Sequence, residues 1–434
     1  MKNRGFFYLF FRPLVKFALV LFYRKIEFDG KESFPQGEAY IIAPNHQNAF
    51  MDALVIACFT KKPIHFLVRA DVFKNKIAAR VFKSFNMLPI YRERDGKHNM
   101  YKNEAIFEKC VHLLSHGEVL MIFPEASHFG KRFLRPLRKG IARIAFDGIA
   151  THSHLSELKI IPVGINYSDY FYSHSDLFLD IGKPLLVKKY YQILAENKLI
   201  ASTEILEELH SSIKNNILHV ESDRIHLAIE KIYLNLIFYV KNLEIFGNTP
   251  KQNHFYFKNK FIPYFEELKN ENQLLEIEQY FELMKKYTIQ YPIQYLSNFS
   301  GLKKFALVMI LIFTFPIYLI SYVSVFLPIV FIKKQIKIKV KDVQFSTSFK
   351  ITAGIFLFGF NGFLYAFILF ALFGNLHLSG VYFFFYPVFY LIYGGYRRML
   401  KKINSIYVLS KIKVEEYELL KMQENHVISI LNIN

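Results

Sequence analysis

Short apolar runs alternate with amphipathic segments between residues 38 and 182. Runs bounded by Gly, Pro, Asn or charged residues predict strands at Tyr40–Ala43, Ile64–Val68, Met87–Tyr91, Glu118–Phe123, Lys159–Gly164 and Leu177–Ile181. Apolar residues at helical intervals between them predict helices at Ala49–Phe59, Val72–Phe85, Asn99–His116 and Arg138–Ala150. This alternation is typical of an α/β fold whose mostly parallel sheet is flanked by helices.

The first 30 residues predict a helix of a different kind. Phe7, Phe10, Leu14 and Phe17 recur at helical spacing within residues 5–24, and the cations Arg12 and Lys16 lie four residues apart on the other face. These cations and Pro13 argue against a spanning segment, and no small-residue cleavage site for a signal peptide follows. We expect an interfacial membrane helix. A core helix packed on the next domain is the alternative.

Beyond residue 195 the pattern changes twice. Residues 196–300 are rich in Lys, Glu, Asn and Gln, with Leu and Ile at helical intervals, which predicts a polar helical region. Three apolar stretches follow, at Phe305–Ile332, Ile351–Phe373 and Leu376–Gly395. The second is long enough to span a bilayer, which takes about 20 apolar residues, and the second and third predict a transmembrane hairpin.

Cations flank these apolar stretches. Lysines between residues 333 and 350 precede the hairpin, and Arg397, Arg398, Lys401 and Lys402 follow it, so the positive-inside rule places both of its ends in the cytoplasm. Lys303 and Lys304 favour the same side for the start of the first stretch. Because Pro316 and Pro328 also interrupt that stretch, we expect a re-entrant or kinked element there.

The predicted organisation has five parts. They are an N-terminal interfacial helix (1–30), an α/β domain (31–195), a polar helical region (196–300), membrane segments (301–396) and a basic cytoplasmic tail (397–434).

Charge and aromatic content narrow the class of partner. The 434 residues include 55 Lys and Arg against 36 Asp and Glu, a formal net charge of +19, which indicates an anionic partner. The 47 Phe residues concentrate near the N-terminus and after Lys304, which favours a lipid surface over nucleic acid. With only Cys58 and Cys110, a disulfide framework is excluded.

Candidate chemistry begins where the first predicted strand of this domain ends. His46 follows Pro44-Asn45, and Asp52 lies six positions later. On one continuous helix the two would point about 240° apart, so they can meet only with His46 in a loop and Asp52 in the first turns of a helix. A histidine beside a carboxylate suits general base catalysis. Because no G-x-S-x-G nucleophile motif is present, the pattern indicates attack by the substrate's own hydroxyl. With 15 histidines in the chain, chance proximity is the alternative.

Three further strand ends carry polar residues or proline. Arg92 follows the predicted strand at residues 87–91, Phe123-Pro124-Glu125 ends another, and Pro162 lies within a third. The cations Lys131, Arg132, Arg135, Arg138 and Lys139 come next after Glu125. Cations at a common sheet edge suit a phosphate group. A solvated loop or a lipid-headgroup contact is the alternative for each of them.

In this order and spacing, the four stretches resemble the glycerolipid acyltransferase superfamily, which includes glycerol-3-phosphate and 1-acylglycerol-3-phosphate acyltransferases. The resemblance covers roughly Gly30 to Gly182. It implies that His46 is the general base and that Asp52 orients it. Acceptor or phosphate binding is implied for Arg92 and Glu125, to which the later cations Arg135 and Lys139 are added as candidates. Asn45, Phe123, Pro124 and Pro162 are expected to contact the acyl donor or to be structural.

Two features depart from the usual family pattern. Five residues separate His46 from Asp52, where most members have four; the longer spacing resembles that of a branch with C-terminal membrane segments. Ala126, Ser127 and His128 stand where Gly, Thr and Arg are usual, so the usual phosphate arginine is replaced. The identity of the acceptor therefore stays open.

The sequence thus predicts a membrane-bound O-acyltransferase of phospholipid biosynthesis, acting on glycerol-3-phosphate or lysophosphatidate. Its donor would be acyl-CoA or acyl carrier protein, and its other partners membrane lipids. We expect no metal, no cofactor and no nucleic acid, and a bacterial inner-membrane location with the catalytic domain facing the cytoplasm. Two alternatives remain: a non-phosphate lyso-lipid acceptor such as an acylated amino acid, and a non-catalytic lipid-binding scaffold.

Overall fold

The computed structural model describes residues 6–92, 96–239, 249–268 and 271–431. The chain divides into two compact units, Met1–His219 and Val220–Asn434, each with its own buried core.

The first unit is built on an eight-stranded sheet. Its order is β1-β7-β6-β2-β5-β3-β4, with β8 paired to β6, and all neighbours are parallel except β7 and β8, which run antiparallel to β6. The strands are β1 (Lys25–Asp29), β2 (Tyr40–Pro44), β3 (Ile64–Arg69), β4 (Met87–Ile90), β5 (Val119–Met121), β6 (Lys159–Tyr167), β7 (Asp176–Ile181) and β8 (Leu185–Leu186). This confirms the predicted fold, a mostly parallel sheet with flanking helices.

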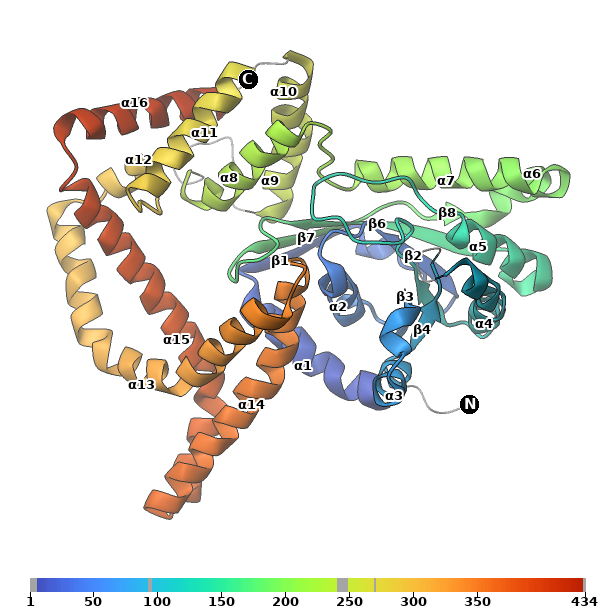
Figure 1. Cartoon of the computed structure of the whole chain (residues 1–434), viewed down its shortest axis with the longest axis horizontal. Helices are drawn as coiled ribbons and strands as arrows, with labels where there is room; N and C mark the ends of the chain where they lie inside the picture. The colour runs from blue at the N-terminus through green and yellow to red at the C-terminus, as the bar shows by residue number, and fades with distance from the viewer. Residues whose placement is uncertain (1–5, 93–95, 240–248, 269–270, 432–434) are drawn as a thin grey trace. The chain divides into compact units, whose positions relative to one another are not determined.

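Helices cover both faces of the sheet (Figure 1). On one face lie α1 (Phe6–Phe22), α2 (Ala49–Phe59) and α3 (Lys76–Ser84), and on the other lie α4 (Asn103–Ser115), α5 (Gly140–Thr151), α6 (Tyr191–Glu196) and α7 (Lys198–Asn215). Because both faces are covered, every residue of β2 is buried, as its unbroken apolar sequence requires. Helix α2 is buried as well, since it lies between the sheet and α1.

Helix α1 has one buried face and one exposed apolar face. Tyr8, Leu19 and Phe22 are buried, and the Tyr8 hydroxyl donates to the Ala57 carbonyl of α2 at 3.4 Å. The opposite side stays exposed although it is apolar; Phe7, Leu9, Phe10, Leu14, Phe17 and Val20 lie there. One face of α1 therefore packs on the domain, and the other offers a second apolar surface.

Some predicted element boundaries are wrong. The predicted helix 72–85 is a 3₁₀ turn, Ala70–Phe73, followed by α3, and the predicted helix 99–116 likewise begins with a 3₁₀ segment, Lys97–Lys102. Strand β1 was not predicted, because its sequence KIEFD mixes charged and apolar residues and all five are only half-buried. Strand β6 continues three residues beyond the predicted end at Gly164.

The second unit contains a polar helical part. Its helices are α8 (Asp223–Tyr239), α9 (Pro250–Tyr256), α10 (Ile262–Leu268), α11 (Glu271–Lys286), α12 (Ile293–Ser297) and α16 (Val414–Leu431). Aromatic side chains form much of its core, with Phe257, Phe261 and Tyr280 fully buried.

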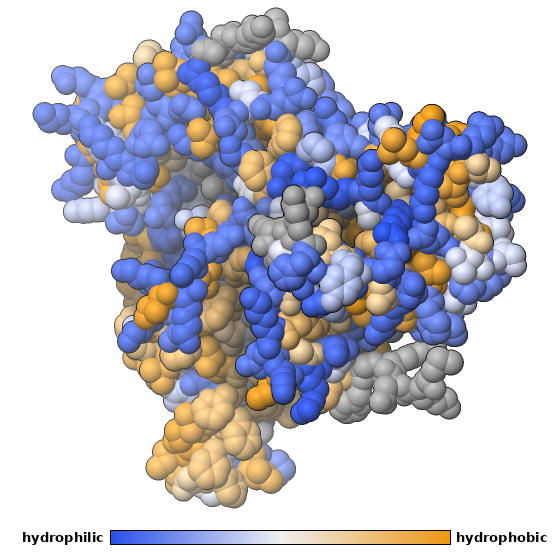
Figure 2. All heavy atoms as spheres, turned by 45° about the vertical axis from the view of Figure 1, so that its right-hand side comes forward, coloured by the Kyte–Doolittle hydropathy of each residue, from blue (hydrophilic) through white to orange (hydrophobic). Residues whose placement is uncertain are grey.

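Three longer helices follow the polar ones: α13 (Gly301–Lys339), α14 (Phe345–Phe373) and α15 (Leu376–Leu409). Each is long and apolar enough to cross a membrane. Apolar side chains gather over the projecting end of the α14–α15 hairpin, at the bottom of Figure 2. Helix α13 is one continuous helix that bends along its length and contains both Pro316 and Pro328 (Figure 1).

Buried polar groups join the three long helices at the second proline. Pro328 has no N–H to donate to the Ser324 carbonyl one turn earlier. That carbonyl accepts hydrogen bonds from Asn361 Nδ2 of α14 at 2.7 Å and from the Tyr386 hydroxyl of α15 at 2.8 Å. Asn361 Nδ2 also donates to the Tyr386 oxygen at 2.7 Å. The carbonyl freed by the proline therefore becomes the point where the helices are linked.

Candidate active site

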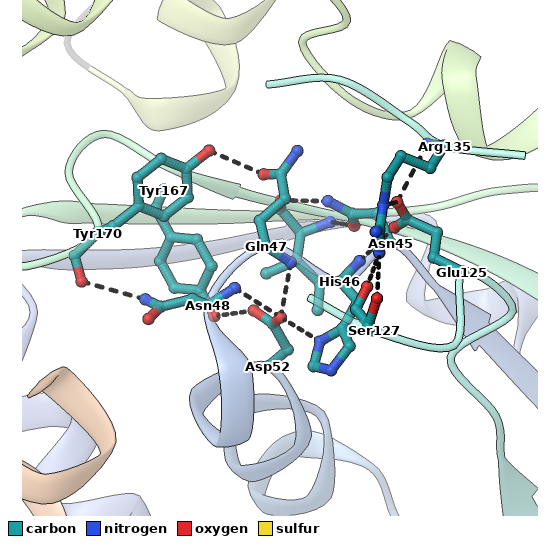
Figure 3. A network of polar contacts seen from close by, with 11 residues as sticks. Asn45, His46, Gln47, Asn48, Asp52, Glu125, Ser127, Arg135, Tyr167 and Tyr170 are labelled. Carbon is teal, nitrogen blue, oxygen red and sulfur yellow. Dashed lines mark hydrogen bonds and ion pairs between the residues drawn. The ribbon is translucent and has the colours of Figure 1, made fainter. Parts of the chain in front are cut away.

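His46 and Asp52 meet directly after β2. His46 lies in the loop that follows Pro44, and Asp52 lies in the first turn of α2, as their spacing required. His46 Nδ1 is 2.9 Å from Asp52 Oδ2 (Figure 3). The Asp52 side chain is fully buried and that of His46 is 15% exposed. A carboxylate at Nδ1 fixes the tautomer in which Nε2 can accept a proton.

Three further donors hold the Asp52 carboxylate. The backbone N–H groups of Gln47 and Asn48 donate to Oδ2 at 2.9 and 2.8 Å, and the Tyr167 hydroxyl donates to Oδ1 at 2.8 Å. Ala49, at the start of α2, has a φ of +43°, in the left-handed region that L-residues avoid. The longer His-to-Asp spacing is thus accommodated by a loop that wraps its own N–H groups around the aspartate.

Asn45 and Phe123 position the histidine from two sides. The Asn45 amide pairs with the backbone of Ile165 in β6, donating to its carbonyl at 3.2 Å and accepting from its N–H at 2.7 Å. The Phe123 ring stacks on the imidazole of His46, with ring centroids 3.9 Å apart. Between the two expectations for these residues, the contacts favour a structural part, Asn45 fixing the loop to the sheet and Phe123 fixing the ring plane.

Glu125 points into the protein and joins two loops. Its carboxylate accepts from the backbone N–H of His46 at 2.7 Å and from that of Arg135 at 3.1 Å. Burial raises the pKa of Glu125 to about 7, although both N–H bonds and the Arg135 guanidinium oppose the shift. These contacts favour a positioning part for Glu125 over the expected contact with an acceptor.

The cations predicted to bind phosphate have protein partners or lie further out. Arg135 donates to the carbonyl and hydroxyl of Ser127 and lies 3.5 Å from Glu125. Arg92, beyond β4, is 3.8 Å from Asp71. Lys139 occupies the N-cap position of α5 without a side-chain capping hydrogen bond and is exposed.

The contacts of the two prolines favour a structural part over contact with an acyl donor. Pro124 is buried, and its carbonyl accepts from the Arg138 N–H at 2.8 Å. Pro162 lies within β6 beside Ala43 of β2, and its carbonyl accepts from the Gly182 N–H at 2.9 Å.

The turn after Glu125 contains two of the residues that depart from the usual family pattern, Ala126 and His128. Ala126 has a φ of +62°, a conformation that glycine adopts without strain and alanine does not. His128 lies edge-on to His46, with ring centroids 5.6 Å apart. A second histidine thus lies beside the first where an arginine is usual.

Comparison with known proteins finds similarity to acyltransferases. A family model described as Acyltransferase matches residues 25–166. The 1-acyl-sn-glycerol-3-phosphate acyltransferase of Bacillus subtilis (strain 168) is 23% identical over 191 residues, which cover 43% of this chain and 87% of that protein. Residues 25–166 therefore carry an acyltransferase domain of the kind found in glycerolipid acyltransferases. Among solved structures, the 1-acyl-sn-glycerophosphate (LPA) acyltransferase PlsC from Thermotoga maritima is 16% identical with a TM-score of 0.34, over 49% of this chain and 84% of that one.

Tyr167 contacts the candidate site but was not among the residues predicted from the sequence. It is the last residue of β6, and the strand was expected to end at Gly164. Complete burial beside Asp52 raises the pKa of Tyr167 well above its usual value, so it remains a neutral donor to the carboxylate. Tyr167 lies at the end of the strand that carries Pro162, and this position was the one feature that could have marked it as a candidate site residue.

Proposed function

We propose that this acyltransferase is a membrane-bound O-acyltransferase of phospholipid synthesis. It would move an acyl chain from an acyl thioester, acyl-CoA or acyl carrier protein, to a hydroxyl of lysophosphatidate or glycerol-3-phosphate. The observation that supports this best is the His46–Asp52 pair, in a loop at the end of a parallel strand, with Nδ1 bound and Nε2 left for a substrate proton. The three candidate spans support the membrane location, and the activity for which the Bacillus relative is named supports the acceptor.

The proposed mechanism is direct transfer. Nε2 of His46 takes the proton of the acceptor hydroxyl as its oxygen attacks the thioester carbonyl. The buried carboxylate of Asp52 stabilises the imidazolium that forms, and its other donors keep it in place. The tetrahedral intermediate then loses its C–S bond, and the imidazolium returns the proton to the leaving thiolate.

Purified full-length protein with labelled acyl-CoA and acyl carrier protein tests this proposal on lysophosphatidate and glycerol-3-phosphate. His46→Ala should lower kcat by about 100-fold or more, the usual contribution of a general base. His154→Ala, an exposed histidine remote from the sheet edge, is the matched control and should keep full activity. Full activity in His46→Ala would remove the assigned base, and no turnover by the wild type on any acceptor would favour the scaffold alternative.

A non-phosphate lyso-lipid acceptor is the second candidate. It is favoured because Arg92 and Arg135 already contact carboxylates and His128 replaces the usual arginine. If the acceptor carries a phosphate that Arg92 binds, Arg92→Ala should raise its KM by about tenfold or more, the cost of losing a charge-assisted hydrogen bond. An unchanged KM, together with turnover of an acylated amino acid, would select the second candidate.

A further inference from the structure

Helix α3 exposes apolar side chains between cations. Ile77 is 74% exposed and Val81 is 46% exposed, and their separation of four residues places them on one helical face. Lys76, Arg80 and Lys83 are exposed on the same helix, whose sequence KIAARVFKS has no carboxylate. The other side of α3 packs inward, where Phe82 contacts Phe73 with ring centroids 5.6 Å apart. Ile77 and Val81 therefore do not belong to the face of α3 that packs against the rest of the domain.

The exposed apolar face of α1 lies beside this helix. Phe11 of α1 contacts Phe85, directly after α3, with ring centroids 5.8 Å apart. Figure 1 shows α3 next to the N-terminal half of α1. Phe10 and Phe7 of α1 are 55% and 52% exposed. Two neighbouring helices thus expose apolar side chains, and α3 exposes cations beside them.

We propose that α3 is a second lipid-docking element of the acyltransferase domain, inserting Ile77 and Val81 into the interface of an anionic bilayer. Amphipathic helices with cations beside an apolar face bind such interfaces by combining apolar burial with attraction to anionic headgroups. The charge complementarity selects an anionic lipid surface over another protein face. The same chain carries three candidate membrane spans, which keep a bilayer within reach of this domain.

The placement of α3 also connects lipid contact to the proposed site. The 3₁₀ turn Ala70–Phe73 precedes α3 at the carboxyl end of β3. Its Asp71 is hydrogen-bonded to Arg69 and lies 3.8 Å from Arg92. The carboxyl end of β2, which leads to His46, lies at the same edge because the strands are parallel. A lipid acceptor in the docked leaflet would therefore meet the protein near this edge. That consequence rests on the proposed function, whereas lipid docking by α3 does not.

The absence of tryptophan from the chain provides a clean test. The full-length Ile77→Trp variant, reconstituted in liposomes with anionic lipid, has a single indole at the proposed insertion point. Its emission should be blue-shifted, and brominated acyl chains should quench it by about half. Leu199→Trp, at a 59% exposed leucine of α7 on the other face of the sheet, is the matched control and should stay unquenched. Adding Arg80→Gln and Lys83→Gln to Ile77→Trp should reduce the quenching, as should replacing anionic by zwitterionic lipid.

Two results would overturn the proposal. Emission from Ile77→Trp equal to that of Leu199→Trp would show that α3 faces water. A blue shift without quenching by brominated lipid would show that protein covers Ile77. Neither reading depends on acyl transfer, so failure of the docking proposal and failure of the proposed enzymatic function remain distinguishable.

Discussion

The hydroxyl of Tyr167 holds the Asp52 carboxylate from the side opposite the imidazole. Tyr167→Phe removes this donor without changing the shape of the ring. A buried hydrogen bond to a charged group contributes about 1.5–3 kcal/mol, so kcat should fall roughly tenfold or more while KM stays unchanged. Steady-state kinetics check this, with Tyr190→Phe, which loses a hydrogen bond to Glu208 at a remote position, as the control. Equal losses in the two variants would contradict a specific effect on the site.

Glu125 gives the domain a dependence on pH. Burial raises its pKa from 4.5 to about 7, so between these values the unfolded chain ionises Glu125 while the folded protein keeps the proton. The stability contributed by this group is present below about pH 4.5 and is lost as pH rises through about 7. Glu125→Gln cannot titrate at this position. The Tm of the wild type should therefore fall relative to that of Glu125→Gln as pH rises from about 4.5 to about 7, and the difference between the two should stay constant above that range. Thermal unfolding at a series of pH values measures it; a constant difference across the range would contradict the assignment.

What the sequence could predict at this scale was the identity of reactive residues more than their orientation. His46 and Asp52 are close in the chain, so their meeting depends on one local turn. Glu125 and Tyr167 reach that turn from other strands, and whether Glu125 faces an acceptor or the backbone of His46 depends on how the sheet assembles. Such long-range contacts leave no periodic signal in the sequence.

At the scale of elements, buried strands were predictable because their apolar runs are continuous. Gly164 misled the prediction of β6, since glycine commonly marks a strand end. Here it allows a close approach instead: a Cβ at Gly164 would lie 1.9 Å from the Asn216 carbonyl oxygen at the end of α7. The fold thus uses this glycine for packing between α7 and β6, which a local pattern cannot distinguish from a turn.

Because Pro328 has no N–H, the Ser324 carbonyl depends on donors from α14 and α15. Asn361→Leu would leave the Ser324 carbonyl with one donor and should destabilise the bundle by about 1 kcal/mol, as for polar contacts in membranes. In Pro328→Ala the helix regains an N–H for that carbonyl, so the cost of Asn361→Leu should shrink in this background. Unfolding in mixed micelles with increasing SDS measures all four proteins of the cycle.

Tyr365, which lies in α14 like Asn361, provides a matched control. The Tyr365 hydroxyl donates to the Val323 carbonyl at 3.2 Å, but that carbonyl is one turn before Leu327, which has its own N–H. Tyr365→Phe should therefore cost less than Asn361→Leu. An equal cost of Asn361→Leu with and without Pro328 would show that the proline is not the reason for the link.

At the scale of the whole molecule, the positions of the cations restrict the membrane topology more than the lengths of the helices do. Within the described residues, three helices are long and apolar enough to span. Lys303 and Lys304 nevertheless lie in the first turn of α13, a lysine cluster lies at its other end, and a further cluster follows residue 396. If α13 crossed the bilayer once, one of its cationic ends would be on the outer side, against the positive-inside rule. We therefore expect the bent α13 to return to the side from which it starts, and the α14–α15 hairpin alone to cross.

Cysteine labelling distinguishes the two arrangements. Burial raises the pKa of both native thiols, Cys58 and Cys110, to about 12, so a membrane-impermeant maleimide should leave them unmodified. Single cysteines at the exposed positions Ser300, Val343 and Ser410 should then react only in inside-out vesicles, whereas one at Asn375 should react only in intact spheroplasts. Labelling of Val343→Cys and Ser410→Cys from opposite sides would contradict the crossing hairpin. Labelling of Ser300→Cys and Val343→Cys from opposite sides would instead make α13 a true span, and the acyltransferase domain and the hairpin's cationic ends would then lie on different sides of the membrane.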